Sequence, residues 1–87
     1  MPHYFFHTQN GDCIRDDQGE ELPNAEAARE EAVTVLGEIL RYRGPAFWTT
    51  GTFSVIVTDT EGQTIVSVTA RASDAAPEGW SLQEGDR

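Results

Sequence analysis

Hydrophobic and polar positions follow two different periods along the chain, and these periods predict its secondary structure. Residues 3–8, HYFFHT, are rich in aromatic residues and precede Asn10-Gly11, a strong hairpin signal because both residues tolerate a positive φ. We therefore expect a second strand, over residues 12–16, to fold back on the first. A two-residue loop places Cys13 on the face of the first strand that carries Tyr4 and Phe6, whereas a three-residue loop places Ile14 there. The pattern leaves both registers open.

A helical period replaces this alternation in the middle of the chain. Asn24 is a suitable N-cap, and Gly44 followed by Pro45 is typical of a helix C-terminus. Small and aliphatic residues recur between these signals at spacings of three and four, which makes one apolar stripe. The residues of this stripe are Ala25, Ala28, Ala32, Val35, Leu36 and Ile39. The alanines near its N-terminal end predict a helix that lies close against whatever it covers.

Alternation returns in two segments near the C-terminal end, TFSVIVTD (residues 52–59) and QTIVSVTA (residues 63–70). An even loop length brings the Phe53, Val55 and Val57 side chains beside those of Val66 and Val68, and an odd length separates the two sets. The pattern therefore predicts a four-residue loop over residues 59–62. In this arrangement Ile56 and Ile65 lie on the opposite face of the sheet.

Together these elements predict an α+β fold in strand-strand-helix-strand-strand (ββαββ) order. We expect a small, mainly antiparallel four-stranded sheet with one helix packed on one face, and the spatial order of the strands stays open. Residues 1–70 form the predicted single α+β domain, in which residues 44–51 are a loop. Residues 71–87 lose all periodicity and are rich in Gly, Pro and acidic residues, so we expect an acidic, disordered C-terminal tail.

Two acidic segments share one pattern, IRDDQGEEL (residues 14–22) and VTDTEGQTI (residues 57–65). An EF-hand loop needs ligands at positions 1, 3, 5 and 12 around a glycine at position 6. Placing Gly19 or Gly62 at position 6 puts Ile14 or Val57 at position 1, so both alignments fail. Aspartate opens and glycine closes a tight turn, and we interpret both segments as turns.

Net charge limits the classes of partner. Fifteen acidic residues against six basic ones give a net charge of −9, which argues against nucleic acid or an anionic membrane surface. No apolar run reaches the roughly 20 residues of a membrane helix, and no secretory signal precedes the first strand. We therefore expect a cytoplasmic protein. The single cysteine, Cys13, lies among aspartates that disfavour its thiolate, and we expect a half-buried strand residue there.

Few residues point to chemistry. His3 and His7 share a strand face but lie about 13 Å apart at about 3.3 Å per residue, too far for one zinc ion. No nucleophile motif and no phosphate-binding glycine loop is present. We predict no catalytic, cofactor-binding or metal-binding residues and no cofactor. A small hydrolase or a metal-binding protein is the third functional class, after the two interaction classes described next.

Surface residues favour contact with another protein. One helix covers only one sheet face, so Ile56 and Ile65 are candidates for an interaction surface, and so are Phe47 and Trp48 in the loop after the helix. The leading interpretation is a small non-enzymatic protein-interaction module, with a protein partner or self-association as a homodimer. The alternative is an acidic regulator that binds a basic protein surface, and salt dependence distinguishes the two.

The central part of the chain resembles a short bacterial family classed as a domain of unknown function. The residues that carry this resemblance are Tyr4 to Phe6, Gly11-Asp12, Ile14 to Asp16, Gly19, Glu21 to Pro23, Glu26 to Arg29 and Glu31-Ala32. The resemblance covers about residues 3–70, supports the fold and implies a bacterial origin. It implies no activity, cofactor or catalytic residue.

Arg29 lies at the edge of the apolar helix stripe. We consider two roles for it: an ion pair with Asp16 or Asp17 that ties the helix to the first hairpin, or a surface arginine whose stem covers the core.

Overall fold

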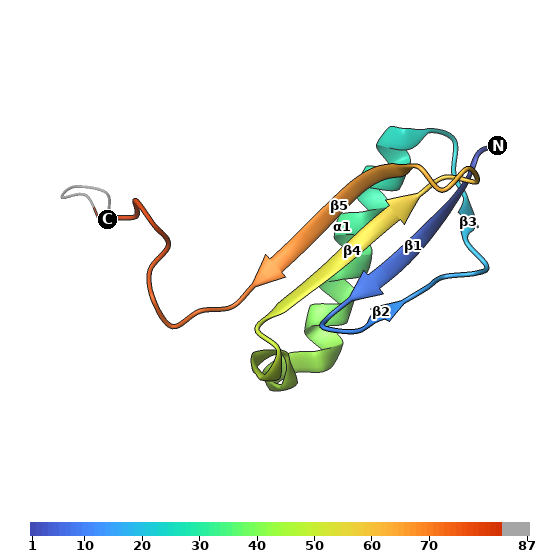
Figure 1. Cartoon of the computed structure of the whole chain (residues 1–87). Coiled ribbons are helices and arrows are strands. Elements are labelled where there is room, and N and C mark those ends of the chain that lie inside the picture. Colours follow the sequence, from blue (N-terminus) through green and yellow to red (C-terminus); the bar gives the residue numbers. More distant parts are fainter. Residues whose placement is uncertain (83–87) are drawn as a thin grey trace.

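The computed structural model describes residues 1–82 and places one helix against one face of a mainly antiparallel sheet, which confirms the predicted α+β fold (Figure 1). The strands are β1 (His3–Gln9), β2 (Cys13–Ile14), β3 (Glu20–Glu21), β4 (Thr52–Thr58) and β5 (Thr64–Arg71). The helical elements are α1 (Ala25–Arg43) and the 3₁₀ helix η1 (Gly44–Thr49).

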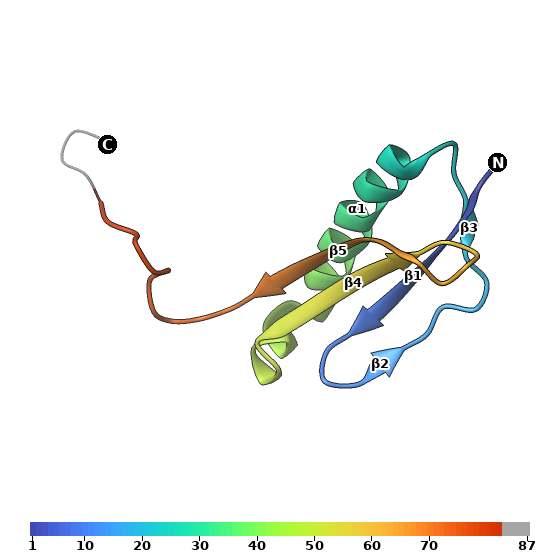
Figure 2. The same cartoon turned by 45° about the horizontal axis from the view of Figure 1, so that its top comes forward.

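The sheet brings together strands from the two ends of the domain. Its order is β2-β1-β4-β5, and β3 also pairs with β1, so β1 and β4 are central (Figure 2). β2 pairs with the end of β1, through Thr8 and Gln9, and β3 pairs with its beginning, through His3 and Tyr4. β2 and β3 therefore divide one edge of β1 between them, while β4 occupies the other edge.

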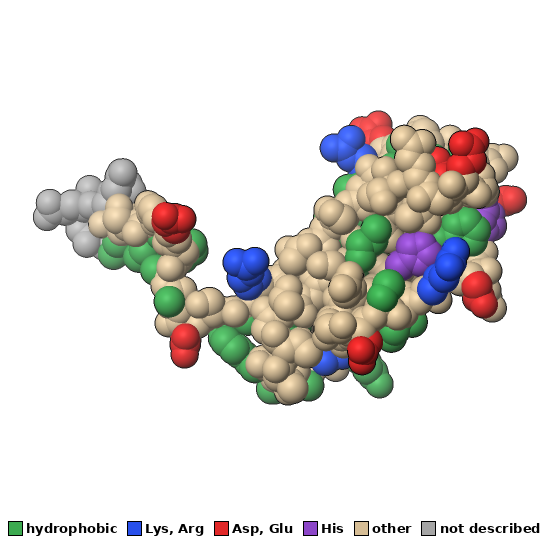
Figure 3. Space-filling model, in the orientation of Figure 1, with side chains coloured by type: hydrophobic (Ala, Val, Ile, Leu, Met, Phe, Trp, Pro, Cys, Tyr) green, Lys and Arg blue, Asp and Glu red, His purple; other side chains and the backbone are tan. Residues whose placement is uncertain are grey.

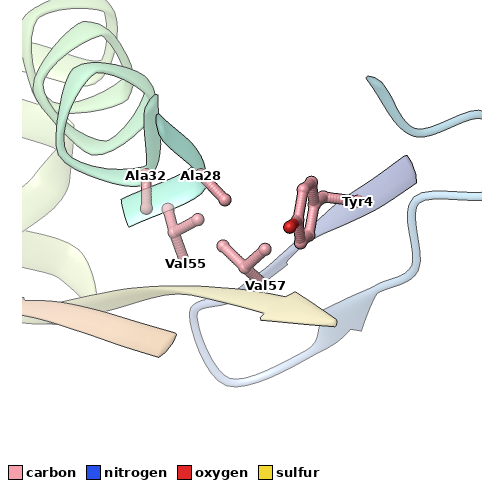
Figure 4. Close-up of a cluster of buried hydrophobic side chains, with 5 residues drawn as sticks. All are labelled: Tyr4, Ala28, Ala32, Val55 and Val57. Atoms are coloured by element: carbon pink, nitrogen blue, oxygen red, sulfur yellow. The ribbon is translucent and has the colours of Figure 1, made fainter. Parts of the chain in front are cut away.

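α1 packs over β4 and β5 through its alanines. The Asn24 side chain caps the helix by accepting the Ala27 N–H at 2.9 Å, and Gly44 ends it at a φ of 53°. Ala28 and Ala32 are fully buried, and Figure 4 shows them directed at Val55 and Val57 of β4, with Tyr4 alongside. Small side chains at these positions let the helix axis approach the sheet closely, as the sequence predicts.

The first hairpin uses the three-residue alternative. Gln9 pairs with Cys13 and Thr8 pairs with Ile14, so residues 10–12 form the loop. Gly11 has a φ of 109°, whereas no residue other than glycine has a positive φ in the described chain, so Asn10 does not enter the two-residue turn that Asn-Gly favours. Cys13 is exposed, which corrects the expectation that it is half-buried.

The second hairpin keeps the predicted faces but not the predicted loop. Val57 pairs with Val66, as expected, but Thr58 pairs with Thr64, so five residues rather than four separate the strands. A register shift next to this pair leaves Ile65 as an extra residue, and this β-bulge restores the alternation that an odd loop would break. Ile65 packs against the core cluster, so its predicted place on the opposite face with Ile56 is wrong.

Two short elements complete the fold. Residues 44–51, predicted as a loop, consist largely of η1, because Pro45 at the helix start is compatible with a 3₁₀ turn. β3 is a fifth strand, because the extended segment before Pro23 lies along β1.

β5 ends at Arg71, and the described residues after it lead away from the domain without forming a helix or strand (Figure 1). The predicted tail, residues 71–87, lies partly outside the described residues. Neither helical element described is both long and apolar enough to cross a membrane.

Candidate functional site

The sheet face opposite α1, called the outer face below, presents a continuous set of side chains. Alternation along each strand directs these residues away from the helix, since their neighbours Tyr4, Val55 and Val57 are buried beneath it. The outer face consists of His3, Phe5 and His7 from β1, Ser54, Ile56 and Thr58 from β4, and Ser67 and Thr69 from β5.

An aromatic row runs along β1 on this face. The rings of His3 and Phe5 have centroids 5.1 Å apart in a tilted arrangement, and those of Phe5 and His7 are stacked at 6.4 Å. Residues two apart on one strand project to the same side, so this row follows directly from the alternation in HYFFH. The row presents a mixed apolar and polar surface of three half-buried rings.

Hydrogen bonds on both sides hold the His7 ring in place. Its Nδ1 accepts the Asp16 backbone N–H at 3.0 Å, so in the neutral ring the hydrogen is on Nε2, which lies 2.9 Å from Thr58 Oγ1 and donates to it. Both ring nitrogens are therefore engaged within the domain. This arrangement leaves His7 neither a free lone pair for a metal nor a free base for proton transfer.

The Asp16 carboxylate ties the segment between β2 and β3 to β1. Oδ2 accepts the Phe6 N–H at 3.0 Å, while Oδ1 accepts the N–H groups of Gln18 at 3.0 Å and Gly19 at 3.2 Å. Partial burial by itself raises the pKa of Asp16, but these three donors, together with the charge that His7 carries when protonated, hold the pKa below its usual value. An ionised Asp16 is thus part of the scaffold of the site.

A shallow cavity of about 380 Å³ adjoins the ring of His7. Phe5 forms its apolar wall, while Arg15, Asp17 and Asp59 bring charges of both signs to its lining. The described residues contain no group of three or more His, Cys, Asp or Glu side chains that is arranged to hold a metal ion.

The predicted interaction residues do not form one patch. Ile56 lies on the outer face opposite His7, whereas Ile65 belongs to the core on the other side of the sheet. Phe47 and Trp48 lie in η1, which packs against α1 and the start of β4 at one end of the sheet. Phe47 is half-buried there, and Trp48 is 60 % exposed.

Of the two roles considered for Arg29, the contact with Asp16 of the first hairpin is not made. Arg29 is exposed on α1 beside Glu26, Glu30 and Val33, and the Asp16 carboxylate is occupied by backbone donors instead. The first hairpin is therefore tied to β1 rather than to the helix.

Acidic residues are absent from all three long strands. β1, β4 and β5 contain no Asp or Glu, although the whole chain contains fifteen. Figure 3 views the outer face and shows a histidine bordered by hydrophobic and uncharged surface and by a basic side chain, with the acidic side chains nearer the periphery. A strongly acidic protein thus presents one broad face whose strands carry no acidic side chain, with acidic residues in the turns beside it.

Sequence reasoning weighed His3 and His7 as metal ligands, favoured partly exposed strand histidines instead, and did not identify the row that they form with Phe5. The signal was present, because the odd-numbered positions of β1 are all aromatic from residue 3 to residue 7. The link from His7 to Asp16 had no comparable signal, because it depends on how the segment between β2 and β3 crosses the edge of β1.

Comparison with known proteins gives a family but no activity. The family model described as "Domain of unknown function (DUF6894)" matches residues 3–71, which include all five strands and α1. No curated protein and no solved structure matches the chain.

Proposed function

Because the chain belongs to the DUF6894 family, whose function is unknown, we propose a function from the surface of the domain itself. The domain is a non-enzymatic protein-interaction module, and it binds a partner protein through the outer face of its sheet. The main support is the separation of charge: the three long strands are free of acidic residues in a chain of net charge −9. A face that served only to keep the protein soluble would need no such separation.

The chemistry of the face defines the kind of partner. Phe5 and Ile56 supply half-buried apolar area at its centre, while Asp17, Asp59 and Glu61 lie in the turns at its border. Such a surface fits a partner with an apolar contact patch and basic residues around that patch. Apolar contact provides most of the affinity, and the acidic border speeds the encounter.

Binding measurements with matched variants test this proposal. Wild-type and Ile56→Ser domains serve as parallel baits for affinity capture, and each protein retained only by the wild type is purified and titrated by calorimetry. We expect Phe5→Ser and Ile56→Ser to weaken binding at least tenfold, which corresponds to about 1.4 kcal/mol. Tyr42→Ser is the control, because Tyr42 is exposed on the helix and lies away from the outer face, and it leaves affinity unchanged.

Equal affinity for the wild type and the two outer-face variants would contradict the proposal. The proposal would also be contradicted if the wild-type and Ile56→Ser baits captured the same proteins.

A second candidate function, an acidic regulator of a basic protein surface, is favoured by the net charge of −9. Salt separates the two functions. Binding that depends on the apolar face keeps most of its affinity between low and high ionic strength, whereas binding that depends on the acidic residues loses it.

A further inference from the structure

The two edges of the sheet differ in how they are protected. The β1 edge is occupied by β2, β3 and the Asp16 carboxylate, whereas no strand of the described chain pairs with the outer edge of β5. We propose that this free edge pairs in antiparallel fashion with β5 of a second copy, so that two domains form one continuous sheet. This inference does not depend on which partner the outer face binds.

The hydrogen-bond pattern identifies the backbone groups at the free edge. Phe6 directs its N–H away from β4, to Asp16, and residues in an antiparallel sheet alternate between their two neighbours. Val57, which is paired with Phe6, therefore directs its backbone groups away from β1 and toward β5. Its partner Val66, and Val68 two residues later, direct their backbone groups to β4. The residues whose backbone groups point to the free edge are Ser67, Thr69 and Arg71.

Beyond the bulge at Ile65, β5 lacks the features that usually protect an exposed edge strand. Natural edges carry β-bulges, proline, lysine or inward-pointing charges, or are short. β5 has eight residues, TIVSVTAR, and its only charge is at the last position. Ser67 and Thr69 are small and uncharged, so neither side chain blocks an approaching strand, and the β-branched Val68 between them favours pairing.

The helix also leaves apolar surface beside this edge. Burial, and then the charges of Glu20 and Glu38, raise the pKa of Glu31, which places this half-buried residue toward β3, the strand that pairs with β1. Leu40 is about 180° from Glu31 around the helix at ~100° per residue, so it lies on the β5 side of α1. Val33, which is 61 % exposed, lies on the same side two turns earlier. A second domain added at β5 brings its own helix alongside this surface and covers it.

Charge favours the antiparallel direction. In this direction Arg71, at the end of β5, approaches the turn before β5 of the other copy, where Glu61 is exposed. Two-fold symmetry makes this contact twice. Elsewhere the two copies repel each other, since each has a net charge of −9, so added salt strengthens the pairing. This salt response is opposite to that of an acidic regulator bound to a basic surface.

Light scattering on the whole chain, coupled to size-exclusion chromatography, tests the proposal. We expect a mass twice the 9.6 kDa of the chain, with the dimer fraction rising as salt is added. Ser67→Pro removes a backbone N–H that points to the free edge without removing one from the β4 ladder, and it reduces the mass to that of one chain. Gln9→Lys is the control, because Gln9 is exposed in β1, with β4 between it and the free edge, and it leaves the dimer intact.

Amide hydrogen exchange in the unaltered protein provides a second test that needs no variant. We expect the Ser67 and Thr69 N–H groups to be protected at high protein concentration and to exchange rapidly on dilution, while the Val66 and Val68 N–H groups stay protected throughout.

A wild-type monomer at high concentration and high salt would overturn the proposal, and so would a dimer that survives Ser67→Pro or is lost in Gln9→Lys. Loss in Gln9→Lys alone would assign self-association to the β1 side of the sheet. Partner binding through the outer face is measured separately, by the Phe5 and Ile56 variants, so the two proposals fail independently.

Discussion

Two turns, residues 16–19 and 59–62, share the pattern Asp-x-x-Gly but have different roles in the fold. Asp59 accepts the N–H groups of Glu61 and Gln63, both at 2.9 Å and both with Oδ1, and so closes the β4–β5 hairpin from within. Asp16 uses Oδ1 in the same way for its own turn, but its Oδ2 accepts the N–H of Phe6, ten residues earlier.

The difference shows how a local motif gains a tertiary role. β3 pairs with the beginning of β1 and β2 with its end, so the Phe6 N–H in the middle of β1 faces neither strand. Asp16 Oδ2 supplies the acceptor for this N–H group. The sequence pattern specifies the turn in both places. Only the position of the first turn, against the edge of a strand, turns it into a tertiary contact.

Replacing the glycine of each turn, Gly19 or Gly62, by alanine tests this difference. Of the substitutions described here, Gly19→Ala has the largest expected effect. Gly19 and Gly62 have φ values of 71° and 82°, but a Cβ at Gly19 would lie 2.7 Å from the Tyr4 carbonyl oxygen, whereas a Cβ at Gly62 meets nothing within 4 Å. We expect Gly19→Ala to lower the free energy of unfolding by about 3 kcal/mol and Gly62→Ala by about 1 kcal/mol. Urea unfolding followed by far-UV circular dichroism measures both, and equal losses would remove the distinction between the turns.

Replacing each aspartate by asparagine tests how many carboxylate oxygens each turn needs, because an amide NH₂ group takes the place of one of the two oxygens. The Asp59→Asn side chain keeps one oxygen, which is all that the second turn uses, so this substitution costs less than about 0.5 kcal/mol. Asp16→Asn places an amide NH₂ against either the Phe6 N–H or the N–H groups of the turn, and we expect a loss of about 2 kcal/mol. The same urea titration measures both variants, and a cost at Asp59 as large as that at Asp16 would contradict the assignment.

His7 is a further contact that only the first turn makes. His7→Phe keeps the ring on the outer face but removes the acceptor for the Asp16 N–H and the hydrogen bond to Thr58, at a cost of about 1 kcal/mol. We expect the Asp16 amide to exchange with solvent much faster in the variant than in the wild type. The amide of Gln63 in the second turn is the internal control, and its exchange changes only as far as global stability changes.

Acid titration gives the smallest expected effect and tests the charge on Asp16. Its pKa is lowered in the folded state, so the unfolded state binds the proton more readily, and the resulting stability is present above the unfolded pKa of about 3.8 and lost as the pH falls through the folded value. The wild type therefore loses more stability than Asp16→Asn below about pH 4. Parallel pH dependence of the two proteins would show that Asp16 carries no such linkage.

Elements with local signals were predictable from the sequence. Asn24 and Gly44 mark the ends of α1 because a cap acts on N–H and C=O groups within one turn of itself. Ala28 and Ala32 identify the buried stripe because helical spacing fixes which side chains share a face. The outer face follows in the same way from alternation along β1 and β4.

Features that depend on contacts between distant segments were not predictable. The bulge that moves Ile65 into the core compensates a five-residue loop, and alternation alone predicted an even loop without a bulge. The strand order, β3 and the bond from Phe6 to Asp16 all depend on which edge of β1 each segment reaches. The spacing of residues in the sequence does not indicate which edge of β1 a segment will pair with.

The central position of β1 has a consequence for synthesis on the ribosome. β1 emerges well before its partner β4, which begins only at Thr52. The β4–β5 hairpin closes over a short loop, whereas β1 must close a loop of more than forty residues to reach β4. A nascent chain therefore leaves the aromatic side chains of Tyr4, Phe5 and Phe6 without their sheet until β4 has left the ribosome, and during this interval the three rings are open to aggregation or to a chaperone.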